Sequence, residues 1–280
     1  MTNENTCSDN NSENSHVITF ISDMSLKSHL VFSQWSNYSP VHIYSAFYFA
    51  NMSKHLEEKY QTECVTRQQK DKITIKDKYV NQHRACVTSA IFASVAFLEA
   101  TINELFSEIV EFPDGYYANQ LDSDTKSKMK KLWTEEDISY ERTLEKFHKV
   151  LSVAGKQALD KGSSPYQDIN FLIKIRNVLM HYKPQMIIQS SDFEPIPITK
   201  KFNELNFHAL ESANKFPQNP LFEEYSPYFP DRCLGYGCAQ WAANSSVKFV
   251  KKFYNTLGVE PHPALDTYGN IADFSGIICP

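Results

Sequence analysis

Apolar side chains recur every three or four residues along much of the chain, a spacing that predicts amphipathic helices. The first run covers residues 41–60 and follows Pro40, which suits the start of a helix. The longest covers residues 80–111 and stops before Pro113-Asp114-Gly115, a sequence that breaks helices. Three further helices are predicted at residues 135–154, 169–183 and 239–257.

Individual residues at the ends of these runs support the predicted bounds. Gly155 follows the third helix and can cap it, because glycine readily adopts the left-handed conformation found at helix ends. Asp168 suits the start of the fourth helix and Pro184 its end, since the proline ring disfavours continuation of a helix. Residues 61–75 are polar, and we expect a solvated loop or helix end there.

The remaining segments lack helical spacing. Residues 1–15 are rich in Asn, Ser and Glu and predict a disordered tail, and residues 16–21 are a candidate short strand. Residues 184–230 hold most of the prolines and are predicted to be irregular, with strand character at 186–189 and 196–199.

The predicted fold is therefore mainly all-α, with minor β structure. Residues 16–185 would form an antiparallel helical bundle with a long second helix. Residues 186–280 would form a partly irregular extension that ends in a helix and packs on the same domain.

Composition narrows the range of functions. A chain of 280 residues can bury a sizeable core, and only 8 glycines argue against a turn-rich β-sandwich or barrel. The net charge of −5 argues against a broad electrostatic grip on nucleic acid. A small basic cleft on an acidic body remains compatible with it, and Lys174, Arg176 and Lys183 are the residues that would form one.

We expect a cytoplasmic protein with free thiols and no membrane span. The polar start of the chain lacks the hydrophobic segment of a secretory signal. The most apolar stretch, 85–98, is interrupted by polar residues and is predicted to be a core helix. Cys233 and Cys238 have no second pair of ligands nearby, and the Gly-containing turn around them lacks the full P-loop pattern, so neither metal nor cofactor is expected.

The candidate chemistry lies in residues 175–182, Ile-Arg-Asn-Val-Leu-Met-His-Tyr. At about 100° per residue, Arg176 and His181 stand about 140° apart on a helix, with Asn177 between them. They would therefore flank a groove or meet their copies across a two-fold axis. His181 would lie in the last turn, where the helix dipole favours a positive charge.

Each of these side chains suits phosphodiester chemistry. A histidine can donate or accept a proton, an arginine binds phosphate oxygens with a fork of donors, and an asparagine amide can orient the phosphate or a 2′-hydroxyl. On spacing alone, a plainer interpretation is favoured, an amphipathic helix with Arg176 and His181 in solvent. Its core side would be Leu172, Ile175, Leu179 and Tyr182.

The wider sequence favours the functional interpretation. Residues 172–184, Leu-Ile-Lys-Ile-Arg-Asn-Val-Leu-Met-His-Tyr-Lys-Pro, resemble the signature helix of HEPN (higher eukaryotes and prokaryotes nucleotide-binding) domains. That signature is an arginine, a polar residue, a few residues and a histidine, late in an apolar helix. Residues 96–105 look like the long second helix of these bundles, and the resemblance covers roughly residues 41–185.

The resemblance implies a metal-independent endoribonuclease that pairs two motifs across an RNA cleft in a homodimer. Arg176, Asn177 and His181 match the motif, and Lys174, Tyr182 and Lys183 surround it. In one toxin subgroup a tyrosine follows the histidine after one residue. Here Lys183 holds that position and Tyr182 directly follows His181, which puts the nucleotidyl-transfer regulation of that subgroup in doubt.

Glu99 is predicted to support the motif helix. It interrupts an apolar helix, and Asn103, four residues on, shares its face. Because a carboxylate in an apolar setting needs a partner, we expect Glu99 to be substantially buried and paired with Arg176. The alternative is a glutamate at the helix edge that reaches solvent.

The predicted function is cleavage of RNA through attack of the 2′-hydroxyl, as in a defence or toxin system with an antitoxin or regulatory partner. The rival is a non-catalytic HEPN module that binds RNA, a nucleotide or a protein partner. The net charge favours the rival, and the intact Arg176-Asn177…His181 set favours the enzyme. A third possibility is a structural helical domain in which the motif is coincidental.

Overall fold

A computed structural model describes residues 36–65, 69–183, 187–189, 195–197, 207–224 and 226–267. The described part is mainly helical, which confirms the predicted fold class of a helical bundle. The predicted tail at residues 1–15 and the predicted strand at 16–21 lie outside the described residues.

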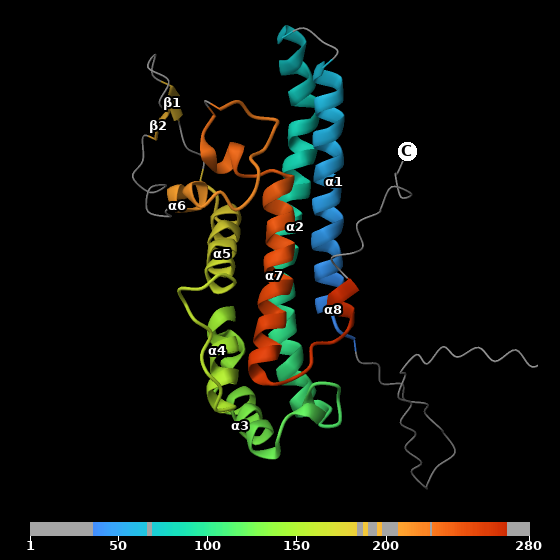
Figure 1. Cartoon of the computed structure of the whole chain (residues 1–280), viewed down its shortest axis with the longest axis vertical. Helices are drawn as coiled ribbons and strands as arrows, with labels where there is room; N and C mark the ends of the chain where they lie inside the picture. Colours follow the sequence, from blue (N-terminus) through green and yellow to red (C-terminus); the bar gives the residue numbers. More distant parts are fainter. Residues whose placement is uncertain are drawn as a thin grey trace, which may run out of the picture. The chain divides into compact units, whose positions relative to one another are not determined.

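Three long helices form the centre of the bundle. Helices α1 (Ser39–Val65) and α2 (Gln69–Glu111) lie alongside each other, and α7 (Tyr236–Leu257) packs against both, as Figure 1 shows. The helices predicted at these places are confirmed.

Of the two alternatives predicted for residues 61–75, the helix end is confirmed, since most of the segment is helical and one helix ends and the next begins within it. Helix α1 continues to Val65 and α2 already starts at Gln69. Apolar side chains within and beside this segment are buried. Tyr60, Ile75 and Tyr79 are buried in a small second cluster that also contains Leu56 and Leu221.

The segment between α2 and α5 is built differently from its prediction. It contains α3 (Ser123–Thr134) and α4 (Thr143–Val153), with short 3₁₀ turns at Ala118–Gln120 and Ile138–Tyr140. The single helix predicted at 135–154 is wrong in its first part. Asp137 has a φ of 51°, a left-handed conformation that separates α3 from α4.

The hydrophobic spacing does not predict α3, because lysines dominate the sequence of this helix. Its apolar side consists of Thr125, Met129 and Leu132, spaced four and three residues apart and all buried. The Asp122 side chain caps the helix by accepting a hydrogen bond of 2.8 Å from the backbone N–H of Thr125.

Glycines end α4 and α7. Gly155 follows α4 with a φ of 64°, which confirms the predicted cap, and Gly258 ends α7 with a φ of 83°. Helix α5 (Tyr166–Met180) starts and ends about three residues before its predicted bounds. Asp168 therefore lies in its first turn, where its carboxylate accepts a 2.6 Å hydrogen bond from the Ser164 hydroxyl.

The region after α5 contains a two-stranded antiparallel ladder. Strands β1 (Ile187–Gln189) and β2 (Pro195–Pro197) pair with Ile188 opposite Ile196, close to the predicted strand positions. Short elements lie on either side of α7 in the sequence. Helix α6 (Phe207–Ser212) and the π-helical turn η4 (Tyr228–Arg232) precede it, and α8 (Ala264–Thr267) follows it.

The main core is shared by helices from both ends of the chain. Phe147 of α4 packs edge-on against Phe249 and Phe253 of α7, with ring centroids 5.0 and 4.7 Å apart. Leu172 and Ile175 of α5 are fully buried in the same cluster. Helix α7, which belongs to the predicted extension 186–280, therefore contributes to the same core as α1, α2, α4 and α5.

One described helix, residues 75–111 of α2, is long and apolar enough to cross a membrane by length and composition. Half of its most apolar window, 50%, is buried by the rest of the protein. A helix at the centre of a bundle meets the same criteria, so this finding is weak evidence for a membrane span.

Candidate functional site

The candidate site lies at the carboxyl end of α5. The inner side of this helix, Leu172 and Ile175, is fully buried, and α5 packs against α2 and α7. Because this packing fixes the rotation of α5, it also fixes which motif side chains reach solvent.

Arg176 is only partly exposed, unlike Asn177 beside it. Its Nε is buried and has no hydrogen-bond partner among the described residues. Leaving a buried donor unsatisfied costs about 1–3 kcal/mol, so such an atom calls for an explanation. Asn177, the next residue, is exposed.

His181 is exposed at the very end of the helix. It is the C-cap residue of α5, with φ −112° and ψ 33°, and its backbone N–H donates a 3.1 Å hydrogen bond to the carbonyl of Asn177. The imidazole is therefore accessible to a solute, one helical turn beyond Asn177, at the negative end of the helix dipole.

The surroundings of His181 are open and carry both apolar and basic groups. Met180 is 55% exposed and Tyr182 is 44% exposed. Lys183 is exposed, and so is Lys174, whose Nζ lies 5.5 Å from the centre of the Phe171 ring. Met180, Tyr182 and Lys183 thus lie with His181 at one end of α5, whereas Lys174 lies further back along the helix.

The plain amphipathic interpretation of this helix is confirmed only in part. Leu172 and Ile175 are core residues as it predicts. Tyr182 is not buried, because α5 ends at Met180 and the chain leaves the core side of the helix there. Arg176 is not fully solvated either, since its Nε is buried.

The predicted contact between Glu99 and Arg176 is wrong. Glu99 instead accepts hydrogen bonds from the hydroxyl of Thr143 and the ammonium group of Lys146, both on α4. Asn103 accepts a 2.9 Å hydrogen bond from the same Lys146 Nζ. The Glu99 side chain is 38% exposed, so the expected substantial burial is found only in part.

The physical reason is the place of α4. The side of α2 that carries Glu99 and Asn103 faces α4, where the Lys146 side chain is completely buried and needs an opposite charge. The spacing of residues in α4 could have indicated that Lys146 faces the core. Lys146 follows Thr143 by three residues and precedes Val150 by four, which places all three on one side of a helix.

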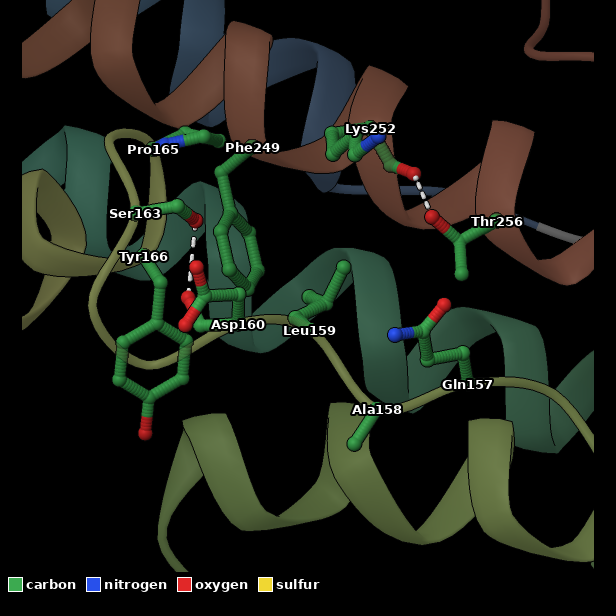
Figure 2. A pocket seen from close by; sticks show the side chains of 10 residues that line it. All are labelled: Gln157, Ala158, Leu159, Asp160, Ser163, Pro165, Tyr166, Phe249, Lys252 and Thr256. Atoms are coloured by element: carbon green, nitrogen blue, oxygen red, sulfur yellow. Dashed lines mark hydrogen bonds between the residues drawn. The ribbon is translucent and has the colours of Figure 1, made fainter.

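A separate cavity of about 280 Å³ lies between the α4–α5 loop and α7 (Figure 2). Its walls include the apolar side chains of Leu159, Tyr166 and Phe249. Two of its hydroxyls are engaged locally: Ser163 donates to the carbonyl of Asp160 and Thr256 to that of Lys252, each at 2.8 Å.

This cavity is not part of the candidate site. Tyr166, in its wall, is the first residue of α5, and Met180 is the last. At about 1.5 Å per residue, the two ends of α5 are about 20 Å apart.

No family model, no curated protein and no solved structure matches this chain. Within the part of the chain that the structure describes, no group of three or more His, Cys, Asp or Glu side chains could hold a metal ion. The four described cysteines, Cys64, Cys86, Cys233 and Cys238, are free thiols.

The side chains at the end of α5 supply three chemical capacities. The exposed imidazole of His181 can transfer protons, the guanidinium of Arg176 can bind phosphate oxygens, and the exposed amide of Asn177 can accept or donate a hydrogen bond. Glu99 and Asn103 have a different role, since they hold α4 to α2 through Lys146.

Proposed function

We propose that this protein is a metal-independent endoribonuclease of the HEPN type that acts on unpaired RNA in the cytoplasm. One observation carries the proposal. At the end of α5, a partly buried arginine, whose Nε has no partner within the described part of the chain, lies five residues before an exposed histidine, with an exposed asparagine between them. Arg176, His181 and Asn177 are these residues, and the helical bundle around them is the kind of fold that the motif requires.

The reaction is a transesterification within the RNA. The 2′-oxygen attacks the neighbouring phosphorus, the bond from phosphorus to the 5′-oxygen breaks, and the products are a 2′,3′-cyclic phosphate and a free 5′-hydroxyl. One proton leaves the 2′-hydroxyl and one reaches the departing oxygen. His181 acts as the base or the acid, Arg176 stabilises the charge on the phosphate, and Asn177 orients it.

A two-fold homodimer would complete the site. Arg176 and His181 stand about 140° apart around α5, too far to converge on one phosphate from a single helix. A second copy placed beside the end of α5 would bring a second histidine and arginine to the same phosphate. The partly apolar surface there, which includes Met180 at 55% exposure, supports this arrangement.

The test is an RNA cleavage assay with EDTA present. Wild-type protein should cut single-stranded or looped RNA and leave a DNA copy intact, since DNA lacks the 2′-hydroxyl. His181→Ala should lower the rate by about two to four orders of magnitude. His262→Ala is the matched control, because His262 is exposed and contacts Tyr116 near the end of α2.

A non-catalytic module is the second candidate, favoured by the net charge of −5. Such a module would bind RNA, a nucleotide or a protein partner such as an antitoxin or regulator. Two results together would indicate this module: Arg176→Ala weakens RNA binding, and the wild-type protein cleaves none of the RNAs tested. Cleavage that continues at the wild-type rate in His181→Ala would exclude the proposed mechanism.

A further inference from the structure

Tyr182 is an exposed aromatic residue directly beside His181. The residue is 44% exposed, so much of its surface faces solvent. In the described part of the chain it takes part in no hydrogen bond, ring contact or cation–π contact. The fold therefore leaves this ring available next to the proposed acid–base group.

The second half of α5 and the residues that follow it are basic. Residues 169–183 contain Lys174, Arg176 and Lys183 and no aspartate or glutamate, in a protein with a net charge of −5. Lys174 and Lys183 are exposed, and neither forms an ion pair with a described residue. An exposed ring among exposed cations is complementary to a polyanion with aromatic bases.

We infer that Tyr182 is a stacking platform for the base next to the scissile phosphate of single-stranded RNA. This inference rests on the proposed function. Consecutive Cα atoms lie about 3.8 Å apart, so a phosphate at His181 brings a flanking base within reach of the Tyr182 ring. In a duplex the bases already stack on each other, and the ring selects RNA whose bases are free.

Tyr182 thus determines which RNA binds, and it takes no part in proton transfer. Stacking on an aromatic side chain is worth about 1–3 kcal/mol per base, which corresponds to about 5- to 150-fold in affinity. Tyr182→Ala should raise KM for single-stranded RNA by such a factor and leave kcat within about twofold. Tyr182→Phe and Tyr182→Trp should keep the wild-type KM, since each retains a ring.

The experiment measures cleavage kinetics together with binding. Binding of labelled single-stranded RNA is followed by fluorescence anisotropy in the His181→Ala background, in which cleavage is slow. A second RNA carries an abasic site beside the cut, and with it the effect of Tyr182→Ala should disappear. Tyr140→Ala is the matched control, because Tyr140 is 88% exposed on the turn before α4.

The outcomes separate this inference from the proposed function. Cleavage that depends on His181 but has the same KM in Tyr182→Ala would overturn the stacking role and leave the proposed function intact. Wild-type protein that neither binds nor cuts RNA would overturn both. Light scattering that shows loss of a dimer in Tyr182→Ala would assign the ring to an interface between copies and also overturn the stacking role.

Discussion

The ammonium group of Lys146, completely buried on α4, is bound by the carboxylate of Glu99 on α2. Asn103, one turn further along α2, accepts a second hydrogen bond from it. The two helices are thereby joined through a charged group that is shielded from solvent. Such a pair is sensitive to the loss of either partner, because the remaining charge is then buried without compensation.

Glu99→Ala should destabilise the fold by about 2–3 kcal/mol. This is below the ~3–5 kcal/mol typical of fully buried pairs, since the Glu99 side chain is 38% exposed. Urea unfolding followed by circular dichroism measures the change. Adding Lys146→Met should restore much of the loss, because the buried charge is then removed. Glu111→Ala, at the exposed end of α2, is the control.

The same variant separates stability from activity. Because Glu99 contacts α4 and not Arg176, folded Glu99→Ala protein should cut RNA with a kcat close to that of the wild type. The measurement is made well below the unfolding temperature. A stable variant that has lost its activity would show that Glu99 acts on the site after all.

Arg176→Ala should lower the cleavage rate by about 100- to 1000-fold, the usual cost of removing one donor from a developing oxyanion. Arg176→Lys should recover only part of the rate, since a lysine keeps the charge but not the fork of donors. Both variants should keep the wild-type circular dichroism. Arg142→Ala, an exposed arginine before α4, is the control. Full activity in Arg176→Ala would exclude the guanidinium from catalysis.

The proposed dimer predicts complementation between inactive variants. If each site takes Arg176 from one copy and His181 from the other, a mixture of Arg176→Ala and His181→Ala should regain about a quarter of the wild-type activity. Light scattering should show twice the monomer mass at micromolar concentration. A monomer, or a dimer mixture without activity, would contradict a shared site.

His148 should make the fold sensitive to acid. Its Nε2 is buried with no hydrogen-bond partner in the part of the chain that the structure describes, and its ring centre lies 5.4 Å from that of Tyr166. Burial lowers the pKa of His148; Glu145 opposes this shift and Lys161 adds to it. The unfolded chain therefore takes up the proton first, so stability is full above about pH 6.5 and falls as the pH drops through the lowered pKa.

Urea unfolding at pH 7.5 and 5.5 tests this sign. The free energy of unfolding of the wild type should fall more between these two values than that of His148→Asn, which has no group to protonate there. Equal falls in both proteins would show that other groups carry the acid sensitivity.

Much of the helical framework follows from sequence alone. The apolar spacing of residues 41–60, 80–111 and 239–257 predicts α1, α2 and α7, because helix periodicity is a local property of the chain. Gly155 ends α4 for an equally local reason, its tolerance of a positive φ. Likewise, the motif at residues 176–181 can be recognised in the sequence without any knowledge of the packing.

Only the tertiary structure decided which side chains meet. Sequence spacing indicated that Glu99 needed a partner, but its choice of Lys146 over Arg176 depends on where α4 packs on α2. In the same way, helical spacing assigns Tyr182 to the core side, but α5 ends at Met180 and Tyr182 is exposed. Periodicity assigns residues to the sides of one helix, whereas partners and exposure depend on the helices that cover those sides.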